Sequence, residues 1–256
     1  MLRGGQEGGR QRGGKGQRQR QPCVTATVDA WGPIAQAAAE PSPRPALLRI
    51  PRRRPGPRSN HYDHLDLGSV KALHARFGHA LAWYVPLGLR PWFKSRGITN
   101  VTELDWWQEA AHGGSGVRVA LTPAQHWSIR TPWSKKQSLW GGWAVLGPRL
   151  RFWFTGDTGY CNVFPEIGER LGPFDLSLIP TGAYEPRWFM KPQHTDPGEA
   201  VAIHQEVRSM RSVACHLATF SLTDEPMDEP VRRLPEVREW AWRLAPGGGA
   251  CCCCCL

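Results

Sequence analysis

Histidine and aspartate residues stand just after short apolar segments of this chain, and this placement limits the folds it can adopt. Three such segments are expected to form β-strands, at residues 117–121, 150–154 and 212–215. His126, Asp157 and His216 follow these segments in that order. In α/β proteins, binding sites assemble in the loops at the ends of strands. The sequence therefore predicts an α/β domain whose site is built from separate loops.

Other segments between residues 59 and 225 extend the α/β pattern. Residues 67–77 have apolar side chains at close to helical spacing. A second helix is expected to begin with Asp196 as its N-cap and Pro197 at its first position. Further short strands are expected at residues 83–86, 143–146 and 176–179, with Gly147 and Pro148 turning a hairpin before 150–154.

The positive charge of the chain is concentrated near its N-terminus. Residues 1–58 contain twelve Lys and Arg against three Asp and Glu, whereas residues 59–256 contain twenty against nineteen. A nucleic-acid-binding domain carries its charge on the folded part, so no specific nucleic-acid partner is predicted. Composition predicts a disordered basic tail at 1–58, a folded domain at 59–245 and a disordered Gly/Cys tail at 246–256. The basic tail can attract RNA or anionic lipid only weakly.

The cysteines are also unevenly placed. Five of the eight form the run Cys251–Cys255, and no disulfide framework is indicated, which favours a reducing, intracellular compartment. The N-terminus has no apolar run of the kind found in signal peptides. No segment approaches the roughly 20 apolar residues of a membrane span. The aromatic stretch 82–93 is explained either by insertion into a membrane interface or by core packing.

The segment from Ser59 to Asp66, SNHYDHLD, places several potential metal ligands in one short loop. His61 and the pair Asp63 and His64 point to opposite sides of a tight loop, so this loop can supply two metals. Histidine and carboxylate ligands suit zinc, and two metals about 3.5–4 Å apart can share a bridging carboxylate. Taken singly, each His or Asp that follows a strand is more simply a loop or core residue. Taken together with this loop, they favour a metal site.

Five motifs in this order and spacing carry a family resemblance: NHYDHLD, PAQHW, FTGDTGY, GAYEPRWFMKPQH and CHLATF. They resemble the metallo-β-lactamase superfamily and, more closely, the N-acyl-phosphatidylethanolamine-hydrolysing phospholipases D. The resemblance covers about residues 59–225. It implies an αββα sandwich of two sheets between helices, and a metallohydrolase domain at 59–245.

The resemblance also implies roles for individual residues. His61 and His126 match ligands of a first zinc, and Asp63, His64 and His216 match ligands of a second. Asp157 matches the aspartate that bridges the two metals. His194 matches a residue near the active site, and Asp63, Asp157 and His194 are the implied catalytic residues. As an alternative, His194 is an exposed loop histidine. Arg187 is expected to form a structural salt bridge rather than a phosphate contact.

The implied reaction is hydrolysis of N-acyl-phosphatidylethanolamine to N-acylethanolamine and phosphatidic acid, with two Zn²⁺ per chain. The resemblance implies a phospholipid substrate and peripheral binding to the cytosolic face of a membrane. It also implies a homodimer with a second copy of the chain. An alternative to this reaction is that the chain is another hydrolase of the superfamily, acting on a different phosphodiester or ester.

Three departures from the family pattern support a different interpretation. Ser59 stands where the pattern His-x-His-x-Asp-His has its first histidine. Residues 1–58 do not show the strands that the family places before this loop, and Leu217 and Ala218 replace a Trp-Gly pair of close relatives. These departures predict a sandwich without its N-terminal strands, truncated or misassembled at both ends. The alternative function is an impaired remnant with a partial zinc site that binds a membrane or another subunit.

Overall fold

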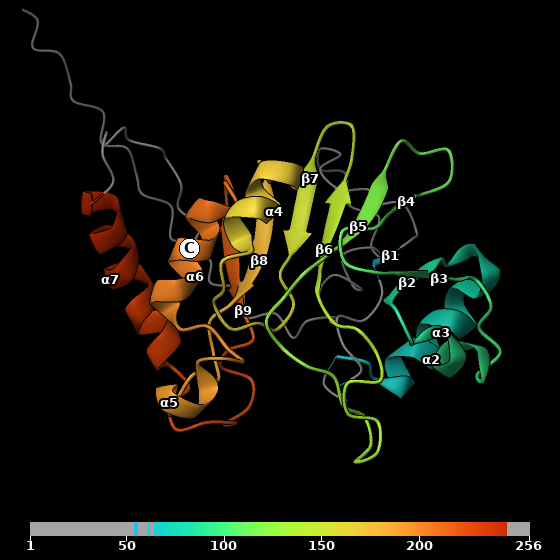
Figure 1. Ribbon diagram of the computed structural model, residues 1–256, viewed down its shortest axis with the longest axis horizontal. Coiled ribbons are helices and arrows are strands. Elements are labelled where there is room, and N and C mark those ends of the chain that lie inside the picture. The colour runs from blue at the N-terminus through green and yellow to red at the C-terminus, as the bar shows by residue number, and fades with distance from the viewer. Residues whose placement is uncertain (1–53, 56–60, 62–63, 245–256) are drawn as a thin grey trace, which may run out of the picture.

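Two β-sheets and the helices outside them make up the molecule (Figure 1). The computed structural model describes residues 54–55, 61 and 64–244. The small sheet is parallel throughout and contains, in spatial order, β1 (Arg54–Pro55), β2 (Trp83–Pro86) and β3 (Val101–Leu104). The large sheet contains, in spatial order, β4 (Glu109–Ala111), β5 (Arg118–Thr122), β6 (Gly142–Leu146), β7 (Arg151–Phe154), β8 (Leu176–Pro180) and β9 (Ser212–Cys215).

The helices lie on both outer faces of the pair of sheets. Figure 1 shows the first group beside the small sheet and the second group on the far side of the large sheet. The first group is α2 (Leu67–Phe77), the short 3-10 turn Gly78–Ala80 and α3 (Arg90–Lys94). The second group is α4 (Phe164–Leu171), α6 (Pro197–Glu206) and α7 (Glu229–Leu244), and the short helix α5 (Arg187–Met190) lies below this group in the figure, among the loops.

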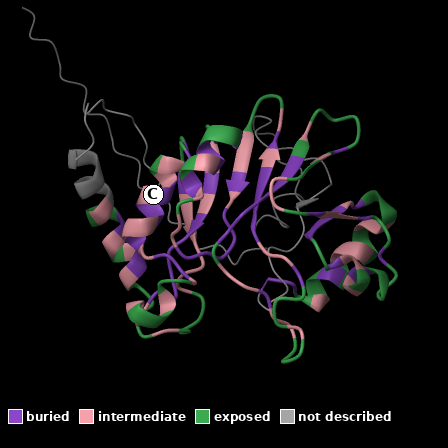
Figure 2. Ribbon diagram, in the orientation of Figure 1, coloured by how far each residue is buried: buried purple, intermediate pink, exposed green. Residues whose placement is uncertain are grey.

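Alternation along the strands creates the layers, because successive side chains of a strand point to opposite faces. Trp83 and Val85 of β2 pack with Phe93 and the other apolar residues under α2 and α3. Tyr84, between them, packs with Trp143 of β6 in the cluster that joins the two sheets. The burial colours of Figure 2 follow the same division, with the strands largely buried and the outer helix faces exposed. The predicted αββα sandwich is confirmed.

The outer face of the large sheet holds the largest buried cluster. Trp153 of β7 stacks on Phe174 with ring centroids 5.8 Å apart, and it meets Phe164 of α4 edge to face at 6.1 Å. Ile167 and Ile203 add the apolar faces of α4 and α6. This packing fixes β7, whose C-terminal end leads into the turn that contains Asp157.

Most of the segments predicted from the sequence are present. The helix at 67–77 and the strand at 212–215 have the predicted bounds, and the strand expected at 117–121 is shifted by one residue. Asp196 caps α6, because it accepts a hydrogen bond from the backbone N–H of Glu199 at 2.9 Å and the Glu199 side chain completes a capping box.

Three findings correct or complete the sequence predictions. β1 lies inside the segment from which no strand was expected, and it pairs with β2. The stretch 82–93 is mostly buried under α2 and α3, so core packing explains it. None of the helices among the described residues is long and apolar enough to cross a bilayer.

We expect Trp153→Ala to lower the free energy of unfolding by about 3–5 kcal/mol, because it removes a fully buried indole from the largest cluster. Trp133→Ala is the matched control, since Trp133 is 85% exposed and should change stability by less than about 0.5 kcal/mol. Urea unfolding followed by circular dichroism measures both values. Equal losses in the two variants would contradict the assignment of the core.

Candidate metal centre

Strand direction explains why residues far apart in sequence meet at one edge of the large sheet. β5 and β7 each run antiparallel to β6, and β7, β8 and β9 are mutually parallel, so β5, β7, β8 and β9 all end at the same edge. His126, Asp157 and His216 follow β5, β7 and β9. His61 and His64 reach this edge from the loop before α2. The predicted convergence of loops is therefore present.

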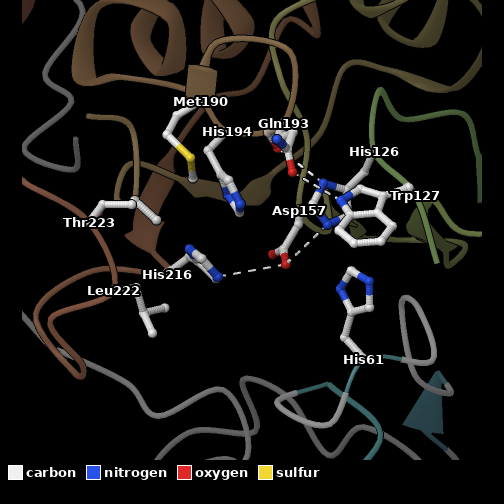
Figure 3. A pocket seen from close by; sticks show the side chains of 11 residues that line it. His61, His126, Trp127, Asp157, Met190, Gln193, His194, His216, Leu222 and Thr223 are labelled. Atoms are coloured by element: carbon white, nitrogen blue, oxygen red, sulfur yellow. Dashed lines mark hydrogen bonds and ion pairs between the residues drawn. The ribbon is translucent and has the colours of Figure 1, made fainter. Parts of the chain in front are cut away.

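The carboxylate of Asp157 lies at the centre of the site (Figure 3). Its Oδ2 is 3.6 Å from Nε2 of His216 and 3.9 Å from Nε2 of His126, and it also contacts Nε2 of His64. Asp157 is only 6% exposed. A buried carboxylate needs positive charge or hydrogen-bond donors around it, and here most of its neighbours are imidazoles, which are the usual companions of a metal.

Asp157 belongs to two groups of potential ligands. The first group is His61, His126 and Asp157, and the second is His64, Asp157 and His216; within each, one donor atom of every residue lies within 4.8 Å of the others. Nitrogen and carboxylate oxygen are the donors that zinc and similar divalent ions accept. Asp63, expected in the second group, lies outside the described residues. His194 belongs to neither group.

Hydrogen bonding prepares His126 for metal binding. Its Nδ1–H donates to the backbone carbonyl of Gln193 at 3.1 Å. This assigns the proton to Nδ1 and leaves the lone pair of Nε2 for a metal, which is the usual arrangement of ligating histidines. Burial lowers the pKa of His126 from 6.5 to about 4, although the Asp157 carboxylate opposes that shift. The imidazole is therefore neutral at physiological pH, as a metal ligand must be.

His194 lies against the metal-binding residues without joining them. Its ring centroid is 5.0 Å from that of His216 and 5.3 Å from that of His126. Burial lowers its pKa to about 3, and the neighbouring histidines lower it further. The side chain is buried, which excludes the alternative of an exposed loop histidine.

Arg187 holds the loop that carries His194. Its guanidinium donates to both carboxylate oxygens of Glu199 at 2.8 Å and to the backbone carbonyl of His194 at 3.0 Å. The predicted structural salt bridge is confirmed, and Arg187 is engaged by these groups rather than directed at a phosphate.

The backbone around His216 is tightly constrained. His216 has a φ of 58°, in the left-handed region that residues other than glycine seldom adopt. A side chain at Gly182, in the loop after β8, would overlap the carbonyl oxygen of His216. The two loops touch through their backbones, and this contact fixes where His216 presents its ring.

A cavity of about 220 Å³ opens over the metal-binding residues. Its walls include several residues that were not predicted from the sequence: Trp127, Ala183, Met190, Gln193, Leu222 and Thr223. Figure 3 shows Met190, Leu222 and Thr223 on the His216 side and Trp127 on the His126 side. Trp127, Ala183, Met190 and Gln193 fall within the motifs of the family resemblance, but no role at the site was predicted for them, because only the folded chain places these residues beside the histidines.

Asp157→Asn should abolish most metal binding, because it removes the carboxylate shared by both ligand groups. The test uses a chain in which Cys251–Cys255 are replaced by serine, since thiolates bind zinc themselves. Asp228→Asn, at an exposed carboxylate beside Arg232, is the control and should retain the metal. Elemental analysis after gel filtration gives the metal per chain. Equal metal contents in the two variants would mean that the metal binds elsewhere.

Metal-free protein should lose stability as the pH falls from 6.5 towards about 4. In this range His126 of the unfolded chain takes up a proton, whereas His126 of the folded chain stays neutral. Protonation therefore favours the unfolded state, by about 1.4 kcal/mol for each unit by which the folded and unfolded pKa values of His126 differ. His126→Gln should make the dependence measured by urea unfolding in EDTA less steep, and the part that remains is expected from His194, whose pKa is also lowered. His79→Gln, at an exposed position, should leave it unchanged. An unaltered slope in His126→Gln would refute the assignment.

Comparisons with known proteins agree with this geometry. Residues 58–217 match the family model of the beta-lactamase superfamily domain. The chain is 45% identical over 189 residues to N-acyl-phosphatidylethanolamine-hydrolyzing phospholipase D 1 of Caenorhabditis elegans, which covers 70% of this chain and 53% of that protein. It is 35% identical over 187 residues to the mitochondrial N-acyl-phosphatidylethanolamine-hydrolyzing phospholipase D of Saccharomyces cerevisiae, covering 71% of this chain and 39% of that protein.

The chain thus spans about half the length, or less, of these relatives. Among solved structures, a metallo hydrolase of the archaeon Ignicoccus hospitalis superposes with a TM-score of 0.57 at 19% identity, covering 73% of this chain and 72% of that one. The family match, the fold and the histidines around Asp157 agree: the chain belongs to the metallo-β-lactamase superfamily.

Proposed function

We propose that this protein is a zinc-dependent phosphodiesterase of the phospholipase D type. It hydrolyses N-acyl-phosphatidylethanolamine to N-acylethanolamine and phosphatidic acid. The observation that carries the proposal is Asp157, shared by two histidine-containing ligand groups at the end of the sheet. The identity of 45% to the Caenorhabditis elegans phospholipase supports the choice of substrate.

The donor set fits two divalent ions. His61, His126 and Asp157 would hold one ion, and His64, Asp157 and His216 the other. Zinc is favoured among divalent ions because these residues offer imidazole nitrogen and few oxygens. When bound, the metal pair lowers the pKa of a water molecule and offsets negative charge on a phosphoryl oxygen.

The chain's own residues position the substrate. His194 is neutral and poorly suited to donate a proton, because its pKa is lowered to about 3. Its buried Nδ1 has no hydrogen-bond partner among the described residues. A neutral imidazole in this place can hydrogen-bond the phosphodiester and strengthen that bond as charge develops on the phosphate. Asp63, expected to orient the nucleophile, stays a prediction.

Exposed apolar residues that line the cavity, or lie close in sequence to residues that line it, support a lipid substrate. Trp188 is 83% exposed, and Phe189, Phe220 and Leu222 are also exposed. Leu222 lines the cavity itself, and Trp188 and Phe189 precede Met190, which also lines it. Exposed tryptophan and phenylalanine side chains suit a membrane interface. Peripheral binding to the cytosolic face of a membrane is part of the proposal, and the expected homodimer stays a prediction.

Turnover of N-acyl-phosphatidylethanolamine in mixed micelles tests the proposal. We expect release of N-acylethanolamine with the zinc-loaded chain and its loss in Asp157→Asn, with activity retained in Asp228→Asn. His194→Phe keeps a ring but removes the hydrogen-bonding nitrogens, and should lower kcat by about 10²–10³. Formation of diacylglycerol instead of phosphatidic acid would place the cleavage on the other phosphoester bond and refute the phospholipase D assignment.

Ser59→His separates the active enzyme from the impaired remnant. Serine is a poor zinc ligand, and the family pattern has histidine at this position. If the impairment is local, Ser59→His should raise both the zinc content and the turnover of the chain. Zinc analysis and the micelle assay measure the two effects. A variant with unchanged zinc and no hydrolysis, beside an inactive parent chain, would favour the non-catalytic alternative.

A further inference from the structure

A second cavity adjoins the metal centre. It has a volume of about 460 Å³, larger than the cavity over the metal-binding residues. The residues that line it are His126, Trp127, Lys135, Lys136, Phe189, Pro192 and Gln193. Three of these, His126, Trp127 and Gln193, also line the first cavity, so the two cavities share a wall. Figure 3 shows these three residues together at one side of the first cavity.

The shared wall is held in place by hydrogen bonds. The indole N–H of Trp127 donates to the side-chain oxygen of Gln193 at 3.0 Å. The backbone carbonyl of Gln193 accepts from His126, as described above. Gln125 also donates from its side chain to the carbonyl of Pro192 at 3.1 Å. A molecule that occupies the second cavity therefore touches residues fixed to a metal ligand.

The two lysines are placed by an ordered loop. The backbone N–H of Lys136 donates to the carbonyl of Ser128 at 2.7 Å, and the Ser128 hydroxyl donates to the carbonyl of Ser138 at 2.6 Å. These hydrogen bonds join the beginning of the loop, at Ser128, to its end, at Lys136 and Ser138. Lys136 has a φ of 57°, a backbone conformation that a lysine adopts only when its surroundings impose it.

The lysines carry charge that no acidic side chain of the described residues neutralises. Neither Lys135 nor Lys136 has an ion pair within the described part of the chain. The Lys135 ammonium lies 5.5 Å from the ring centroid of Trp127. Trp127, Phe189 and Pro192 supply apolar walls to the same cavity. The second cavity thus combines two positive charges with an apolar surface.

We propose that the second cavity binds a lipid with a phosphate monoester headgroup. The phosphate would contact Lys135 and Lys136, and the hydrocarbon would lie on Phe189 and Trp127. A phosphate monoester has a charge of about −1.5 to −2 at neutral pH, which matches two lysines better than a phosphodiester or a carboxylate does. This binding does not require hydrolysis. The proposal rests on the proposed function in one respect: phosphatidic acid, the product of the proposed reaction, is a lipid with a phosphate monoester headgroup.

The test is titration calorimetry of the full zinc-loaded chain with dihexanoyl phosphatidic acid below its micelle concentration. Inorganic phosphate and dihexanoyl phosphatidylcholine are titrated in parallel, to separate the charge of the headgroup from the lipid chains. We expect phosphatidic acid to bind, phosphate to bind at least about tenfold more weakly, and phosphatidylcholine not to bind. Equal affinity for phosphatidic acid and inorganic phosphate would overturn the role of the apolar walls. Equal affinity for phosphatidic acid and phosphatidylcholine would overturn the role of charge.

Matched variants locate the binding site. Lys135→Glu/Lys136→Glu should weaken binding of phosphatidic acid at least about tenfold. The control Lys71→Glu/Lys94→Glu makes the same change of net charge at exposed positions on α2 and α3, and should bind normally. Asp157→Asn should also bind normally, although the proposed function predicts that it cannot hydrolyse substrate. Binding that is lost in Asp157→Asn but kept in the lysine variant would place the phosphate on the metal site and overturn the proposal.

Discussion

The structure depends on one buried carboxylate that is surrounded by imidazoles. Asp157 is almost fully buried, with the rings of His64, His126 and His216 around it. Such a carboxylate is costly unless positive charge or hydrogen bonds compensate it. A divalent metal held by Asp157 and these histidines would supply that positive charge. The burial of Asp157 therefore lowers the stability of the metal-free chain and favours the binding of a metal at this position.

The fold places the histidines around Asp157 by bringing together the loops that follow the strands of the large sheet. β5, β7, β8 and β9 finish at one edge, so His126, Asp157 and His216, the candidate metal ligands that follow strands, need only short loops to meet. Backbone contacts then fix their directions: Gly182 lies directly against His216, and Gln193 holds His126. The rigidity lies in these contacts between loops, which is why the site includes residues with no metal-binding chemistry of their own.

Short-range signals in the sequence were sufficient for many of the elements. The N-cap pair at Asp196 and Pro197 placed α6 correctly, and the apolar run before His216 placed β9. α4 was not predicted, although Phe164, Ile167 and Leu171 are spaced as on one face of a helix, because it has only 8 residues and its N-cap, Val163, provides no side-chain hydrogen bond. α7 was not predicted either, because Pro235 interrupts its helical pattern.

The residues of the site likewise include some that the sequence predicted and some that it did not. Its histidines and Asp157 could be listed from the sequence, since each follows a strand or lies in the loop that begins with SNHYDHLD. The role of Gln193 could not be read from its side chain, because it acts on His126 through its backbone carbonyl. The second cavity was also beyond prediction, because Lys135 lies in a loop and Phe189 in α5, and these segments are distant in sequence and meet only in the folded chain.

X-ray absorption at the zinc edge tests the central claim, that Asp157 and the histidines form one two-metal site. The chain would be loaded with zinc after Cys251–Cys255 are replaced by serine. The account predicts a first shell of nitrogen and oxygen at about 2.0–2.1 Å and a zinc–zinc distance of about 3.5–4 Å. A first shell that contains sulfur at about 2.3 Å, or isolated zinc ions with no second zinc nearby, would contradict it.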